Sequence, residues 1–119
     1  MTEANLHRQI VQYLRLVLPG AVVHHSANEV RRGGRRGHIN RAINVGMGVV
    51  PGYPDLVIHA PDLTAFIEIK TDSGRLSEAQ KALHERLTGM GYQIAVARSL
   101  DDVRAALAAW GFKTREKAA

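Results

Sequence analysis

Two short apolar runs joined by a tight turn constrain the fold of this chain more than any other feature of its sequence. The first run covers Asp55–His59 and the second covers Ala65–Thr71, and the turn residues Ala60-Pro61-Asp62 follow directly on the first. Runs of this length that are rich in Val and Ile are typical of strands, and a short connection favours antiparallel pairing. The sequence therefore predicts a β-hairpin in the middle of the chain.

The N-terminal part carries a helical pattern followed by a short β-rich run. Apolar residues recur at helical spacing over residues 3–18, Thr2 suits an N-cap, and Pro19-Gly20 ends the pattern. Residues 21–27 read as a strand. Residues 38–50 stay open between a short helix and an irregular strand. A helix and a strand are thus expected before the hairpin.

The C-terminal part alternates between helix and strand. Ser77 and Gln80 have the spacing of a capping box. The helix behind them has an expected apolar stripe of Ala79, Leu83, Leu87 and Met90. A strand is expected over residues 92–97, and a last helix is expected between a Ser99 cap and Gly111. The resulting order, α-β-β-β-α-β-α, predicts an α/β fold with a mixed sheet flanked by helices.

Length and composition limit the class of protein. The 119 residues are expected to form a single domain over 1–119, with 113–119 as a frayed tail. The chain has no cysteine, which excludes disulfides, thiolate metal sites and cysteine nucleophiles. It also lacks an apolar stretch of the roughly 20 residues that a membrane span needs. We expect a cytoplasmic protein of a bacterial or phage-infected cell, without a membrane partner.

Positive charge is concentrated in one segment. The formal net charge is +5, from 16 Lys and Arg against 11 Asp and Glu. The excess gathers in a glycine-rich stretch that contains Arg31, Arg32, Arg35, Arg36 and Arg41. Such a cluster suits a polyanion, because each neutralised phosphate releases condensed counterions. A solvated loop that only aids solubility explains the same charge equally well.

The second strand of the hairpin carries an acid and a base among apolar residues. Side chains alternate across a strand, so Glu68 and Lys70 share one face, about 7 Å apart, opposite to that of Ile67. An unpaired buried charge is costly, and this face therefore needs an explanation. Taken alone, a solvated face on an edge strand is the simpler one.

Asp55 changes this balance. It opens the preceding strand, so pairing of the two strands can bring it close to Glu68 at one end of the sheet. Two neighbouring carboxylates repel each other and require a cation, for which oxygen ligands favour Mg²⁺ or Mn²⁺. The backbone carbonyl of Ile69 is a possible third oxygen ligand, and Lys70 would lie where a phosphate or a water approaches.

These motifs resemble a known family. Pro54-Asp55 followed by Glu68-Ile69-Lys70 is similar to the pattern of the PD-(D/E)xK nuclease superfamily. The segments Gly46–Leu56 and Glu68–Thr71, with Gly74-Arg75-Leu76-Ser77 and Gln80, resemble its VRR-NUC family, the virus-type replication-repair nuclease domain. Asn28 ahead of the arginine-rich segment fits as well. The resemblance implies a restriction-endonuclease-like core.

The resemblance also implies roles for individual residues. Asp55 and Glu68 would be metal ligands, and Lys70 would orient the water or stabilise charge on the phosphate. Glu3 matches an acidic family position near the metal, although the helix dipole alone explains an acid there. Gln80 matches a polar position near the site, although its place in the capping box is a sufficient explanation.

Histidines and aromatic residues receive plainer interpretations. The neighbours His24 and His25 are expected to point to opposite faces of a strand. The other histidines show no ligand spacing and are read as surface or satisfied residues: His7, His38, His59 and His84. Trp110 and Tyr92 are read as core rather than base-stacking residues, and Tyr53 as part of a turn.

The combined prediction is a Mg²⁺- or Mn²⁺-dependent endodeoxyribonuclease, selective for branched or four-way junction DNA, in replication, repair or phage DNA metabolism. Asn28, Arg75 and the clustered arginines would bind the DNA backbone. Because a module of this size offers little surface to a duplex, we expect a homodimer. The alternatives are a DNA-binding module without catalysis and a hydrolase acting on small phosphate esters.

Overall fold

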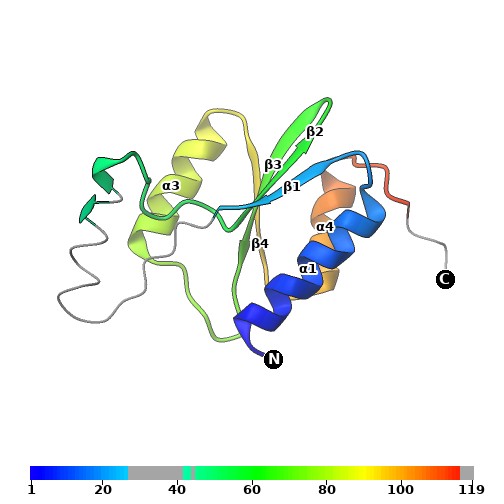
Figure 1. The fold of residues 1–119 in the computed structure, drawn as a ribbon, viewed down its shortest axis with the longest axis horizontal. Helices are drawn as coiled ribbons and strands as arrows, with labels where there is room; N and C mark the ends of the chain where they lie inside the picture. The colour runs from blue at the N-terminus through cyan, green and yellow to red at the C-terminus, as the bar shows by residue number, and fades with distance from the viewer. Residues whose placement is uncertain (27–41, 44, 116–119) are drawn as a thin grey trace.

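A computed structural model describes residues 1–26, 42–43 and 45–115 of the chain. The predicted order of helices and strands is confirmed (Figure 1). The elements are α1 (Glu3–Val17), β1 (Val22–His25), β2 (Leu56–Ala60), β3 (Leu63–Ile69), α3 (Glu78–Gly89), β4 (Gln93–Ala97) and α4 (Leu100–Ala109). Ala42, Ile43, Val45 and Gly46 have a helical backbone, so a short helix is the alternative that the structure favours there.

The strands form one mixed sheet in the order β1-β2-β3-β4. β2 pairs antiparallel with β1 and with β3, which confirms the predicted hairpin. β3 and β4 run parallel, and α3 supplies the crossover that a parallel pair needs. In the hairpin register Leu56 lies opposite Ile67, so the residues just before β2 and near the end of β3 meet at one edge of the sheet.

Local capping sets where each helix begins, as the sequence predicts. The Thr2 hydroxyl accepts a hydrogen bond from the amide of Asn5, and the Ser99 hydroxyl accepts one from Asp102. Ser77 and Gln80 form the reciprocal capping box. Each cap satisfies an amide that has no partner inside its own helix. The start of α3 is therefore fixed by contacts of its first turn.

Helices cover the two faces of the sheet unequally. α1 and α4 lie on one face and α3 lies on the other (Figure 1). The core under α1 and α4 is the larger one and includes Ile10, Leu14, Leu56, Ile67 and Val103, all buried. The core under α3 has only four buried members, Val57, Phe66, Leu83 and Leu87.

Some details differ from the sequence predictions. The expected apolar stripe of α3 is wrong at Ala79 and Met90, which are exposed, because the buried apolar residues of this helix are limited to Leu83 and Leu87. Near the C-terminus, the amide of Arg115 donates to the carbonyl of Val17 at 2.8 Å. Residues 116–119 lie outside the described part. Within the described residues no helix is long and apolar enough to cross a membrane.

Candidate active site

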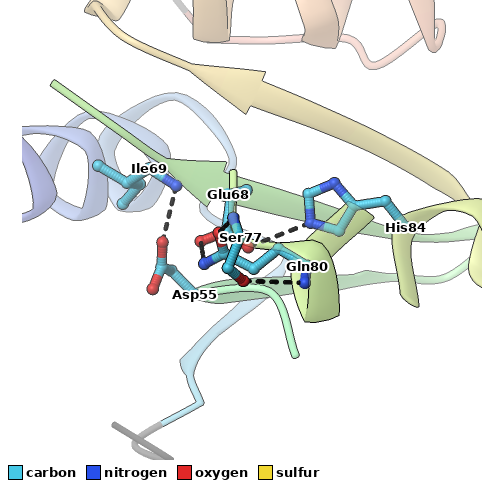
Figure 2. Close-up of polar contacts among 6 residues, drawn as sticks. All are labelled: Asp55, Glu68, Ile69, Ser77, Gln80 and His84. Atoms are coloured by element: carbon cyan, nitrogen blue, oxygen red, sulfur yellow. Dashed lines mark hydrogen bonds and ion pairs between the residues drawn. The ribbon is translucent and has the colours of Figure 1, made fainter. Parts of the chain in front are cut away.

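The start of β2 and the end of β3 bring two carboxylates together. The hairpin register places Asp55, just before β2, opposite Glu68. Asp55 Oδ2 accepts a hydrogen bond from the backbone amide of Ile69 at 2.7 Å (Figure 2). The Asp55 carboxylate thus accepts a hydrogen bond of the kind that a backbone carbonyl would accept if the pairing of β2 with β3 continued. The convergence of Asp55 and Glu68 that the sequence predicts is therefore present.

The same geometry directs a backbone oxygen toward the site. In a strand, the N–H and C=O of one residue point to the same side. The amide of Ile69 is held by Asp55. Its carbonyl consequently faces the same edge, where the sequence analysis expects a third oxygen ligand.

Glu68 is almost fully buried, with 1% of its surface exposed, and helix α3 supplies its partners. Gln80 Nε2 donates to Glu68 Oε2 at 3.3 Å, and His84 Nε2 lies 3.1 Å from Oε1 (Figure 2). Gln80 Oε1 also accepts from the Ser77 amide at 2.8 Å. One side chain, that of Gln80, thus closes the capping box and also contacts Glu68.

The site strongly disfavours charge on Glu68 in the absence of a cation. Burial first of all, together with a hydrogen bond with Asp55 and the negative charge of that residue, raises the pKa of Glu68 to about 9. The charge of Glu3 also acts in this direction, whereas Lys70 lowers the pKa. A carboxyl group in this environment keeps its proton near neutral pH. A bound cation would favour the ionised form instead.

His84 is a site residue that the sequence analysis missed. Its side chain is 12% exposed, and burial lowers the pKa of its imidazole. A neutral ring can donate Nε2–H to an ionised Glu68 and accept from a protonated one. The available signal was the spacing of Gln80 and His84, which places them one turn apart on a single face of α3.

Lys70 and Glu3 lie within electrostatic range of the two carboxylates. Lys70 follows β3 directly, its amide donates to the carbonyl of Ala97, and its charge lowers the pKa of Glu68 and of His84. Glu3 lies in the exposed first turn of α1, and its charge reaches Glu68. The fold therefore gathers both predicted residues around this end of the sheet.

Two contacts support the backbone around the site. The Arg98 guanidinium donates from Nη1 to the carbonyls of Thr71 and Gly74, which holds the turn after Lys70. Gly52 has a φ of +82°, and a Cβ on it would lie 2.5 Å from the backbone of Ala79. The turn before Asp55 can therefore pack against α3 only with glycine at this position.

Only one of the residues predicted to contact DNA lies in the part of the chain that the structure describes. Arg75 is exposed on the connection between β3 and α3. The other predicted DNA contacts lie outside the described residues: Asn28, Arg31, Arg32, Arg35, Arg36 and Arg41.

Of the aromatic residues, Trp110 packs against the larger core as predicted. The core interpretation of Tyr92 is wrong, because this side chain is 42% exposed.

The donor set fits a hard divalent cation. Among the described residues, no group of three or more His, Cys, Asp or Glu side chains is arranged to hold a metal ion. The site instead offers two carboxylates and the carbonyl of Ile69. Mg²⁺ is commonly held by one or two carboxylates and keeps several waters, so this set suits Mg²⁺ or the similar Mn²⁺.

The mixed sheet brings two carboxylates together where β2 begins and β3 ends. The family model described as "VRR-NUC domain" matches residues 3–101. The chain belongs to the VRR-NUC family, as the sequence motifs indicate. A solved structure described as "VRR_NUC domain protein" is similar, with a TM-score of 0.70 and 25% identity over 93% of this chain and 88% of that one. The curated proteins contain no match.

Proposed function

We propose that this protein is a metal-dependent nuclease that hydrolyses phosphodiester bonds in DNA. The observation that carries the proposal is the buried Glu68, which lies opposite Asp55 and two residues before Lys70 at the end of β3. A buried carboxyl beside a second carboxylate destabilises the apoprotein, and cation binding would offset that cost. Membership of a nuclease-type family supports the same conclusion.

Asp55, Glu68 and the carbonyl of Ile69 would hold Mg²⁺ or Mn²⁺. When bound, such an ion lowers the pKa of water and polarises the scissile phosphate. Gln80 and His84 orient the Glu68 carboxylate, each from one of its oxygens. Lys70 would place its ammonium beside the phosphate and stabilise the negative charge that develops there. Glu3 would assist through its charge or as an additional ligand.

The finer features of the proposal concern the substrate. We propose that the arginine-rich segment, with Asn28 and Arg75, binds the DNA backbone through its phosphates. A symmetric homodimer would present two sites to one branched or four-way junction substrate. A strongly basic chain, whose formal net charge is +5, suits a substrate with many closely spaced phosphates.

A cleavage panel tests this function. Single strands, flaps, duplexes and four-way junctions would be incubated with each metal, using the wild type, Lys70→Ala and the control Lys81→Ala. Lys81 is an exposed lysine of α3 paired with Glu78. We expect metal-dependent cutting by the wild type and the control, strongest on the junction, and its loss in Lys70→Ala.

Each part of the proposal can fail separately. DNA binding without Lys70-dependent cutting by either metal would identify a non-catalytic binding module. Cutting of a small phosphate ester that DNA does not inhibit would identify a different hydrolase. A monomeric mass by light scattering, with and without DNA, would contradict the homodimer.

A further inference from the structure

A cavity of about 570 Å³ lies on the α3 face of the sheet, next to the candidate active site. Strands β1, β2 and β3 and the turn before β2 contribute its lining. Its principal lining residues are His24, Tyr53, Val57, His59, Phe66 and Tyr92. The volume is within the usual range for small-ligand pockets, about 300–1,000 Å³. The proposed catalytic mechanism uses none of these side chains.

The cavity has an apolar floor and aromatic walls. Val57 and Phe66 are buried and form part of the small core under α3. The rings of Tyr53 and Tyr92 each meet Phe66 edge to face, at centroid distances of 5.8 and 5.5 Å. Tyr92 nevertheless keeps 42% of its surface exposed. An exposed aromatic ring beside a buried one offers a surface on which a flat, apolar group can stack.

Polar groups surround this floor without adding negative charge. His24 comes from β1, His59 from β2 and Thr64 from β3, and His59 pairs with Thr64 across the hairpin. Asp and Glu do not occur among the lining residues. Hydroxyl and imidazole groups can bond the polar edge of a planar ligand, and a lining without acids does not repel a polyanion.

Two residues that line the cavity lie close along the chain to residues of the proposed metal site. Phe66 lies two residues before Glu68 on the same face of β3, a separation of about 7 Å. Tyr53 is separated from Asp55 only by the buried Pro54. A strand whose phosphate lies at the carboxylates would therefore have its neighbouring nucleotide within reach of the cavity.

We propose that this cavity binds an unstacked nucleobase of the strand that is cut. The inference rests on the proposed nuclease function and makes it more specific, because it selects substrates with an unpaired nucleotide beside the scissile phosphate. A base has an apolar face for Tyr92 and Tyr53 and polar edges for His24 and His59. Stacking on aromatic side chains is how proteins hold single-stranded bases without reading sequence.

Binding without catalysis tests the proposal. Fluorescence anisotropy would compare a labelled single-stranded oligonucleotide with an oligonucleotide of equal length and charge made of abasic nucleotides, both in EDTA. The proteins would be the wild type, Tyr92→Leu, His24→Ala and the control Leu16→Ala, whose residue is 74% exposed on α1. Leucine at position 92 keeps an apolar contact with Phe66, and His24→Ala keeps the test valid if Tyr92→Leu fails to fold.

We expect the wild type and Leu16→Ala to bind the intact oligonucleotide about 5- to 100-fold more tightly than the abasic one. Tyr92→Leu and His24→Ala should lose most of this preference while binding the abasic strand as the wild type does. Equal binding of both oligonucleotides by the wild type, or no measurable binding, would overturn the proposal.

A second copy of the chain is the competing occupant of the cavity. If Tyr92→Leu abolished a dimer measured by light scattering and left the base preference intact, the cavity would be a subunit interface instead. Because the anisotropy measurement needs no metal, its failure is distinguishable from a failure of the nuclease proposal, which the cleavage panel reports independently.

Discussion

The two faces of the sheet differ although the same strands build both. On the α1–α4 face, five apolar residues of β2 and β3 are fully buried: Leu56, Ile58, Ala65, Ile67 and Ile69. On the α3 face, Val57 and Phe66 form a small core, and the row then ends in Glu68. Glu68 is the only charged residue that is buried among those the structure describes.

This difference indicates that one face of the sheet serves stability and the other holds the candidate site. The α1–α4 face provides most of the buried apolar surface and hence most of the stability. The α3 face gives up part of that stability to hold Asp55, Glu68, Gln80 and His84 together. Because side chains alternate along a strand, neighbouring residues of β3 serve the two purposes.

The largest effects are expected from substitutions at two adjacent positions of β3 whose side chains point to opposite faces of the sheet. Ile67→Ala should lower the free energy of unfolding by about 2–5 kcal/mol, because it leaves a cavity in the larger core. Glu68→Gln should leave the free energy of unfolding unchanged or higher. It should lower the cleavage rate by more than roughly 100-fold, because loss of a metal ligand should cost more than loss of a residue that only contacts a ligand. Urea unfolding and cleavage rates measure both. Full activity of Glu68→Gln would contradict the assignment.

The pH dependence of stability should differ between the wild type and Glu68→Gln. Glu68 has a pKa of about 9 when folded and near 4.5 when unfolded, so within this window the folded chain keeps a proton that the unfolded chain releases. The free energy of unfolding contributed by this group should therefore fall as pH rises from about 4.5 to about 9. Glu68→Gln should show a flatter profile than the wild type in thermal unfolding with EDTA. Parallel profiles would show that Glu68 titrates normally.

Two glycines with the same backbone conformation allow a smaller, matched comparison. Gly52 and Gly111 have φ of +82° and +81°, but only a Cβ on Gly52 would meet α3. Gly111→Ala should cost about 1–2 kcal/mol from backbone strain alone. Gly52→Ala should cost more and also lower cleavage, because Ala79 and Gln80 must shift away from Glu68. Equal losses of stability with full activity would exclude this coupling.

The smallest effect is expected at His84. His84→Ala should weaken Mn²⁺ binding and cleavage by about 10- to 100-fold, because one Glu68 oxygen loses its partner. Glu85→Ala changes the next residue of α3, which is exposed, and should leave Mn²⁺ affinity unchanged. Calorimetry provides the Mn²⁺ affinities. If the two variants had the same affinity, His84 would not position Glu68.

Local signals in the sequence predicted much of this fold. The hairpin followed from two β-rich runs and their turn, and the caps at Thr2, Ser77 and Ser99 followed from side-chain chemistry. The pairing of Asp55 with Glu68 followed from strand alternation together with the hairpin. These features depend on neighbours in sequence, for which local rules suffice.

Features that depend on the packing of α3 on the sheet were not predictable in this way. His84 and Gln80 share a helix face, but only the tertiary structure shows that this face meets Glu68. Ala79, Met90 and Tyr92 are exposed because the buried apolar contact between α3 and the sheet is narrow. The width of this contact is likewise a property of the tertiary structure. Arg98 bonds the carbonyls of Gly74 and Thr71, which lie 24 and 27 positions before it in the sequence. No local sequence pattern predicts contacts over such a separation.

Calorimetric titration of the wild type and Glu68→Gln with Mn²⁺ at neutral pH tests the central claim most directly. The account predicts that the wild type binds Mn²⁺ and releases a proton from Glu68, because the cation stabilises the ionised carboxylate. Glu68→Gln should bind far more weakly and release no proton. Equal affinity and equal proton release in the two proteins would contradict a metal site at the α3 face of the sheet.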